Sequence, residues 1–403
     1  MPTAPSTLQT STLPGTLLLL CIVLLSVFPI DMLLPSFPAL AEQFSRSPAD
    51  IALSISLFAI VVAVSQLLVG PLCDVLGRKR LLLLGLALAS FGGLGAALAQ
   101  SFAVFMAFRL LQALACGCFV VAHALIQDLF EDRQRRQIRV MLTTAGGVFI
   151  ASSPLLGSEL EAALSWQASF YSFVFLSLGV LMFALIVLED DRPVAGWCWL
   201  GAFQVYGSIC THPLFISYSL ISALAFACHF SFMVLSPLIL MGELGLSAQA
   251  FSLTLLSYGA AFLASGVAAA RLARMLEPES QIRLGILCIA LAGVTLLILL
   301  NHPHALLAIM LPAAMVAVGT TLIRPAATCL ALELFEHNAG AAAAMGSTLV
   351  LMLGGLASAF INASAGSLRL ELGAFCIVAG ALAMLALLLI AHFLNKTRPA
   401  CQR

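Results

Sequence analysis

A single aspartate interrupts the first long apolar run of the chain. Asp31 stands in the stretch SVFPIDMLLPSFPAL, residues 26–40, where its neighbours are almost all apolar. A charged residue within a membrane span costs about 2.5 kcal/mol or more on insertion scales, so such residues usually face the interior of a helix bundle and mark a pathway. We therefore take Asp31 as the first candidate for chemistry, and proton exchange as that chemistry.

Arg109 is the second charged candidate. It stands in FRLLQALACG, three residues before Gln112, so the two side chains share one face of a helix. Asp31 lies roughly 24 Å along its run and Arg109 roughly 11 Å from the opposite side, so in a core of about 30 Å their depths nearly match. We predict that they meet across the bundle interior, where burial favours the neutral carboxyl and the arginine favours the charged one. Asp31 could then bind and release a proton.

Two alternatives remain open for this pair. Asp31 and Arg109 could form a structural ion pair that never titrates, or Arg109 could extend to the nearby membrane interface. Two further polar residues lie in later apolar runs, His229 in FACHFSFMV and Arg324 in LIRPAATC. His229 is either a cavity residue or a hydrogen-bonded packing residue, and Arg324 either lines a cavity and attracts anions or reaches the interface.

The composition indicates the elements that must position these residues. Of 403 residues, 62% are hydrophobic and only 9% are charged, whereas an average soluble domain has about 25% charged residues. Many apolar runs reach the ~20 residues that cross a hydrocarbon core, which predicts an all-α integral membrane protein with twelve helices. The predicted spans are residues 15–39, 50–71, 81–100, 102–127, 138–158, 168–188, 214–240, 249–270, 282–300, 305–331, 340–362 and 371–394.

The positive charges predict the orientation of these spans. Residues 1–14 carry no positive charge, so the first run is not typical of a cleavable signal peptide. With a cytoplasmic N-terminus, only Arg46 and Arg369 lie on the opposite side, and most Lys and Arg lie inside. We therefore predict an inner-membrane, multi-pass protein with both termini in the cytoplasm. The residues on the cytoplasmic side are Arg78, Lys79, Arg80, Arg133, Arg135, Arg136, Arg139, Arg192, Arg271, Arg274, Arg283, Lys396, Arg398 and Arg403.

The longest connection divides the chain into two similar parts. We predict an N-terminal six-helix bundle over residues 1–188, a cytoplasmic linker over 189–213 and a C-terminal six-helix bundle over 214–403. DLFEDRQRRQ after the fourth span is echoed by ELFEHNAGAA after the tenth, as expected for two halves related by pseudo-symmetry. The linker, which contains Trp197, Trp199 and Tyr206, is either a small amphipathic helix or an ordinary connection.

The loop after the second span carries the most specific motif, GPLCDVLGRKR. It resembles the signature loop of the major facilitator superfamily, G-x-x-x-D-x-x-G-R-[KR]-[KR], which implies two pseudo-symmetric six-helix bundles and a gating role for the loop. A small residue at its start permits close helix approach, and a glycine before the basic residues permits a tight turn. The gating residues are Gly70, Asp74, Gly77, Arg78, Lys79 and Arg80.

The fifth span reads GGVFIASSPLLGSEL and resembles the glycine and proline motif of family members that exchange protons for drugs. Its candidate residues are Gly147, Pro154 and Gly157, although generic packing of small residues explains the pattern as well. IDMLLPSFPAL, the signature loop, RLLQ and SPLIL together resemble the bicyclomycin/chloramphenicol resistance (Bcr/CflA) branch of drug:proton antiporters. By that resemblance, Asp31 couples protons or binds substrate.

The function predicted is a proton-coupled antiporter that exports amphipathic small molecules by alternating access. The scattered cysteines form no C-x-x-C pair and no G-x-x-x-x-G-K-[ST] motif is present, so we expect no metal, no cofactor and no ATP, with the proton gradient as energy source. The expected partners are a small-molecule substrate, protons and the lipid bilayer, with no nucleic acid, and the chain is expected to be a monomer and not an enzyme. Alternatives are export of a siderophore or an amino acid, uptake, a membrane enzyme, a channel, and a transport-inactive sensor or scaffold.

Overall fold

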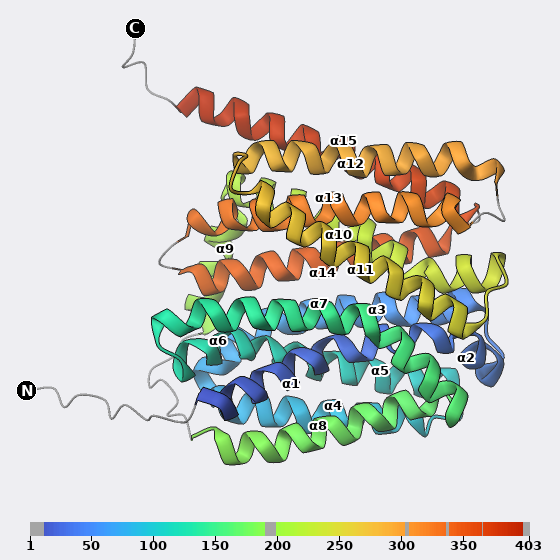
Figure 1. Cartoon of the computed structure of the whole chain (residues 1–403). Coiled ribbons are helices and arrows are strands. Elements are labelled where there is room, and N and C mark those ends of the chain that lie inside the picture. Colours follow the sequence, from blue (N-terminus) through green and yellow to red (C-terminus); the bar gives the residue numbers. More distant parts are fainter. Residues whose placement is uncertain (1–11, 190–198, 303–305, 336–337, 365, 398–403) are drawn as a thin grey trace, which may run out of the picture.

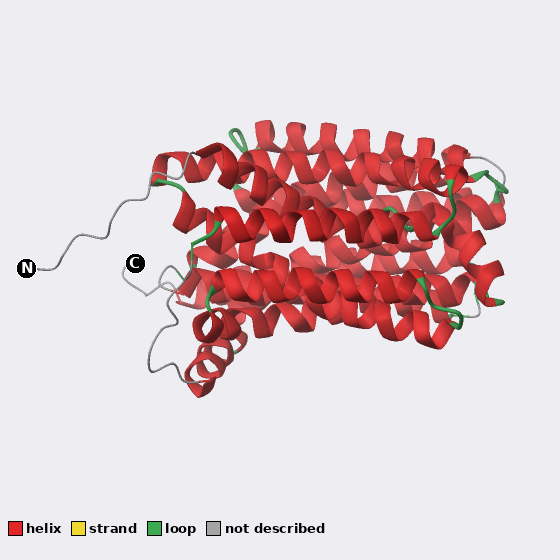
Figure 2. Cartoon of the chain, turned by 90° about the horizontal axis from the view of Figure 1, so that it is seen from below, coloured by secondary structure: helices red, strands yellow, loops and turns green. Residues whose placement is uncertain are grey.

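The computed structural model describes residues 12–189, 199–302, 306–335, 338–364 and 366–397. Within these ranges every regular element is a helix (Figure 2). Twelve stretches are long and apolar enough to cross a membrane, which confirms the predicted spans. The elements are α1 Thr12–Asp31, η1 Leu34–Ser36, α2 Phe37–Phe44, α3 Pro48–Leu76, α4 Arg78–Ala97, α5 Phe102–Cys116, η2 Gly117–Val120, α6 Val121–Leu129, α7 Asp132–Ala163, α8 Gln167–Val187, α9 Trp199–Cys210, α10 Pro213–Ser236, η3 Pro237–Glu243, α11 Ala248–Leu272, α12 Pro278–Ile298, η4 Leu299–Asn301, α13 Leu306–Glu333, α14 Ala339–Ala363 and α15 Leu368–Thr397.

The first predicted span is longer than expected and is not one continuous helix. It extends to Phe44 and is broken after Asp31, where the short turn η1 separates α1 from α2. Proline has no N–H, so Pro35 cannot donate to the carbonyl of Asp31 four residues earlier, and Pro29 likewise cannot donate to the carbonyl of Leu25. The break therefore places Asp31 at a helix end inside the span.

Local sequence also sets the ends of α3. Its first turn has a capping box, in which the Ser47 side chain accepts a hydrogen bond from the Asp50 amide and the Asp50 carboxylate accepts one from the Ser47 amide. At the other end Gly77 has φ 82°, a left-handed conformation that favours glycine, and α4 begins at the next residue. The tight turn predicted in the signature loop is therefore present.

The helices form two groups (Figure 1). α1 to α8 lie together in one group and α10 to α15 in the other, here called the N-terminal and C-terminal halves. α1 begins and α15 ends at the same end of the bundle, called the terminal end below, and α2 lies at the opposite, far end. α9 lies within the predicted linker 189–213, so the helical interpretation of that segment is confirmed for Trp199–Cys210. Residues 190–198 are outside the described part of the chain.

The most extensive contacts between the halves are made by two helix pairs, α3 with α14 and α7 with α11. In the first pair, the hydroxyl groups of Ser56 and Ser358 are hydrogen-bonded at 2.8 Å. The Asn362 amide donates to the carbonyl of Ala49 at 2.7 Å, close to the far end. A Cβ at Gly355 would lie 2.8 Å from the carbonyl oxygen of Ser56, so glycine allows the two backbones to touch.

One of three hydrophobic clusters crosses the boundary between the halves. It contains Leu34 and Phe37 of the N-terminal half together with Phe230, Phe232 and Tyr258 of the C-terminal half. The buried residues of the second cluster lie in the N-terminal half, and those of the third lie in the C-terminal half and α9. The shared cluster brings the region after Asp31 next to the aromatic residues of α10 and α11.

Candidate functional site

Asp31 is buried at the broken end of α1. Only 7% of its surface is exposed. The amide of Met32 still donates to the carbonyl of Phe28, but the amide of Leu33 donates to Ile30, three residues back, as the helix ends. The backbone around Asp31 is therefore no longer regular, and the carbonyl of Pro29 receives no bond from the amide four residues ahead.

Arg109 supplies the missing partner for that carbonyl. Its side chain is fully buried, and one guanidinium nitrogen donates to the carbonyl oxygen of Pro29 at 3.1 Å. The other terminal nitrogen donates to Oε1 of Gln112 at 2.9 Å, which confirms that the two side chains share a face. The guanidinium also lies over the ring of Phe58, 4.3 Å from its centre. Arg109 thus holds the broken end of α1 against α5.

The predicted meeting of the Asp31 and Arg109 side chains is not seen. No hydrogen bond or ion pair joins the two side chains, although both are in the described part of the chain. The break in α1 explains the difference, because it frees a backbone oxygen of Pro29 that takes the guanidinium. The alternatives of a structural ion pair and of an interfacial Arg109 are both wrong for this structure, since Arg109 is fully buried.

Replacing Arg109 with lysine is expected to destabilise the protein. The guanidinium binds two oxygens in a fixed fork, which a single ammonium group cannot reproduce, and each hydrogen bond from a charged group contributes about 1.5–3 kcal/mol. Thermal unfolding of the purified protein in detergent measures the effect. Arg283→Lys, at an exposed position paired with Glu279, is the matched control. An Arg109→Lys variant as stable as this control would contradict the bracing role.

Helix α7, which contains the predicted glycine and proline motif, packs directly on the break in α1. A Cβ at Gly157 would collide with the carbonyl oxygen of Met32, the residue after Asp31. One turn further along α7, Oε2 of Glu161 accepts a hydrogen bond of 3.0 Å from the buried hydroxyl of Ser36. Sequence reasoning missed Glu161, although a carboxylate near the end of an apolar span is a signal that could have identified it.

The same helix also contacts the other half. The carbonyl of Pro154 accepts a hydrogen bond of 2.9 Å from the hydroxyl of Ser252 on α11. A Cβ at Gly147 would lie 2.8 Å from the side chain of Leu263, and Gly259 packs against Ala151. The three predicted residues Gly147, Pro154 and Gly157 therefore lie at two contacts of α7, one with α1 and one with α11.

His229 and Arg324, the predicted polar residues of the C-terminal half, lie among aromatic side chains. Nδ1 of His229 is hydrogen-bonded to the hydroxyl of Tyr258, and the two rings are nearly parallel, at 16°. The His229 ring also lies 4.9 Å from that of Phe262. The guanidinium of Arg324 lies over Phe226, 4.8 Å from the ring centre. We call these five residues the Arg324 cluster; Tyr258 and Phe262 were not among the predicted site residues.

The signature loop contacts the linker helix. A Cβ at Gly70 would lie 2.8 Å from the hydroxyl oxygen of Tyr206, so glycine lets α9 approach the end of α3. Arg78 donates to the carbonyl of Ala124 on α6 at 3.2 Å. The side chain of Asp74 is outside the described part of the structure. Lys79 and Arg80 follow in the first turn of α4, at the terminal end.

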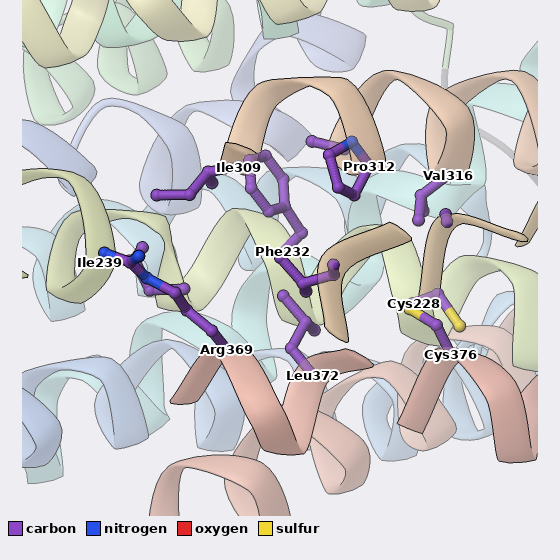
Figure 3. Close-up of a pocket in the computed structure, with 12 residues that line it drawn as sticks. Cys228, Phe232, Ile239, Ile309, Pro312, Val316, Arg369, Leu372 and Cys376 are labelled. Carbon is purple, nitrogen blue, oxygen red and sulfur yellow. The ribbon is translucent and has the colours of Figure 1, made fainter. Parts of the chain in front are cut away.

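A small cavity lies inside the C-terminal half (Figure 3). Arg369 reaches one side of it, and the sulfur atoms of Cys228 and Cys376 lie near each other at another edge. None of the predicted site residues lines this cavity. A second small cavity, behind the break in α1, is lined by Gln112 and Met32 among others, and Asp31 lines neither of the two.

Comparison with known proteins now decides the family. A sequence model described as the Major Facilitator Superfamily matches residues 19–359. The chain belongs to this superfamily. It is therefore a multi-pass membrane protein of a transporter family, and the prediction that it is not an enzyme is confirmed.

Several relatives in the superfamily share about a quarter of the sequence. The multidrug resistance protein MdtL of Escherichia coli O81 (strain ED1a) is 26% identical over 299 residues, which is 74% of this chain and 76% of MdtL. The uncharacterized MFS-type transporter YdgK of Bacillus subtilis (strain 168) is 25% identical over 349 residues, 85% of this chain and 86% of YdgK. The chain is thus similar to a drug-resistance protein and to a transporter without an assigned substrate.

A solved structure confirms the fold. The bacterial homologue of the human lysosomal transporter Spinster, in an inward-facing and unoccupied conformation, matches with a TM-score of 0.70. The match covers 94% of this chain and 98% of the other at 16% sequence identity. The predicted two-bundle membrane fold of the superfamily is therefore confirmed.

The structure brings together only part of the predicted site. Arg109 and Gln112 are in direct contact, and Gly157 lies against the residue that follows Asp31. His229 and Arg324 belong to a separate cluster in the other half, joined to the N-terminal half through Tyr258 in the shared hydrophobic cluster. The site thus has a part with both Asp31 and Arg109 in the N-terminal half and a basic, aromatic part in the C-terminal half.

Proposed function

We propose that the chain is a proton-coupled antiporter of the Bcr/CflA type, which exports amphipathic small molecules by alternating access. The observation that carries the proposal is Asp31, a buried carboxyl group without an ion-pair partner among the described residues, at a break in the first span next to the other half. Such a group can bind a proton in one conformation of the transporter and release it in the other. A substrate whose affinity differs between the protonated and the charged form of Asp31 has its movement coupled to that of the proton.

The arrangement of α7 supports the same mechanism. This helix touches the broken end of α1 through Gly157 and the C-terminal half through Pro154. A change in charge at Asp31 that altered the break would therefore act on α7, which also contacts the C-terminal half. Rocking of the two halves around a central site is the way in which transporters with parallel repeats alternate access.

The MdtL relatives support the choice of substrates. Proteins named for multidrug resistance are 26% identical to most of this chain, and the Phe-rich faces of α10 and α11 suit apolar and aromatic compounds. We propose the inner membrane as the location, with the terminal end in the cytoplasm, because the Lys and Arg of the connecting loops gather at that end. A fluorescent protein fused to the C-terminus, which is bright only in the cytoplasm, tests this orientation.

The proposed coupling is tested in everted membrane vesicles. Respiration acidifies the vesicle lumen, and a pH-sensitive dye reports the gradient while a panel of amphipathic compounds is added. Vesicles with the protein should lose part of the gradient when a substrate is added, whereas vesicles without it should not. The proposal would be refuted if no compound reduced the pH gradient while the vesicles still took up the same compounds without a gradient, because transport would then be uncoupled.

A further inference from the structure

We infer that the Arg324 cluster binds an acidic group attached to a planar aromatic ring, such as an aromatic carboxylate. This inference rests on the proposed function and narrows the class of substrate. It depends on three observations: the place of Arg324 among the helices, the lack of an anionic partner for it, and the rings around it.

The neighbours of α13 show where Arg324 points. Thr320 donates to the carbonyl of Ala225 on α10, and Thr321 is hydrogen-bonded to Ser265 on α11. Residues three and four apart share a helix face, so Arg324 faces the space between α10 and α11. Its contact with Phe226 of α10 agrees with this position. The guanidinium therefore points into the C-terminal half and away from α12, which packs on another face of α13.

Arg324 lacks a counter-ion within the described part of the chain. It forms no hydrogen bond or ion pair there, and its Nε atom is buried without a partner. The other two arginines of the described bundle interior are both partnered: Arg109 binds Gln112 and the carbonyl of Pro29, and Arg369 lies 2.8 Å from the carboxylate of Glu243. Arg324 as a residue is partly buried, and a positive charge within a membrane bundle without a counter-ion is costly, so an anionic ligand would gain the interaction that the protein leaves open.

Flat rings surround the guanidinium. Phe226 is stacked on Phe230 at 5.5 Å and 24°, and Gly354 of α14 leaves room for the Phe226 ring. His229 lies between Tyr258 and Phe262, with its Nδ1 bound to the Tyr258 hydroxyl. Such surfaces favour an aromatic ligand. A cationic aromatic compound is disfavoured, since the charge of Arg324 would repel it.

The cluster lies next to the proposed pathway. Phe230 and Tyr258 belong to the hydrophobic cluster that also contains Leu34 and Phe37, which follow Asp31 in the first span. Phe226 and Phe262 pack on the edge of the same cluster, as does Ile30. A ligand held by Arg324 would thus be near the junction between the halves, where Asp31 exchanges its proton in the proposed mechanism.

A pair of probes that differ only in charge tests the inference. The purified full chain in lipid nanodiscs is titrated calorimetrically with 2-naphthoate and with the neutral 2-naphthamide, and empty nanodiscs are subtracted. The unmodified protein should bind naphthoate at least about tenfold more tightly than naphthamide. It should also bind naphthoate more tightly than octanoate, which has the acid without the ring.

Variants assign the preference to Arg324. Arg324→Gln should bring the affinities for the two naphthalene probes within about twofold of each other, and Arg324→Lys should keep part of the preference. Arg283→Gln, on the exposed surface, should behave as the unmodified protein does. Equal affinity of the unmodified protein for both naphthalene probes, binding of neither, or a preference that survives in Arg324→Gln would overturn the inference. Because pH is equal throughout, a failure of proton coupling at Asp31 leaves this result unaffected, and a failure of binding leaves the coupling unaffected.

Discussion

Replacing Asp31 with asparagine is expected to abolish proton-driven efflux while leaving the protein folded and inserted. The asparagine side chain has nearly the same shape as that of aspartate, but its amide group does not titrate near neutral pH. Since the carboxylate of Asp31 makes no ion pair in the structure, its loss orphans no buried charge. The measurement is efflux in everted vesicles under an imposed pH gradient, and the expected rate is that of vesicles without the protein.

The matched control makes the same chemical change elsewhere. Asp50→Asn alters a carboxylate in the exposed first turn of α3, far from the break in α1. This variant should keep its efflux and lose only part of the capping contribution, about 1 kcal/mol. Gradient-driven efflux by Asp31→Asn at the rate of Asp50→Asn would show that the carboxyl group of Asp31 has no part in coupling.

The second large effect is expected for Gly157→Ala. The added methyl group would collide with the carbonyl oxygen of Met32, and this oxygen belongs to the backbone, so it cannot rotate away as a side chain could. Overpacking of this kind costs about 1–3 kcal/mol. We expect a lower unfolding temperature, and a still stronger loss of transport, because α7 would be pushed away from the broken end of α1.

Gly179→Ala provides the comparison for this variant. Gly179 lies within α8, and a Cβ there would meet nothing within 4 Å. Alanine favours a helix over glycine by about 1 kcal/mol, so this variant should be as stable as the unmodified protein or more stable. If both alanine variants unfold and transport alike, close packing of Gly157 on α1 is not required.

Much of the fold could be predicted because the signals are strong and local. Three signals can be read from short stretches of sequence. They are the twelve long apolar runs, the preference of positive charge for one side, and the motif around Gly70 and Gly77. Contact between Arg109 and Gln112 also followed from helical spacing alone. These features depend on periodicity and composition, which a single sequence displays directly.

The parts that could not be predicted depend on irregular backbone. Matching depths suggested that Asp31 and Arg109 would meet, and depth was estimated on a continuous helix. The break after Asp31 frees the carbonyl of Pro29, and this oxygen takes the guanidinium. Likewise, Tyr258 joins His229 only because α10 and α11 pack side by side, a relation between distant segments that no local pattern contains.

The bond between Arg109 and the oxygen of Pro29 has an electrical consequence. A peptide oxygen keeps its dipole whether or not Asp31 carries a proton, so the arginine stays satisfied in both states. In the proposed mechanism, each protonation of Asp31 then changes the net charge of the N-terminal half by one unit, and with an uncharged substrate each turnover moves one proton charge across the membrane. A unit charge that crosses the whole field responds to voltage by about 2.3 kcal/mol per 100 mV, so the membrane potential should drive such an exchange alongside the pH difference.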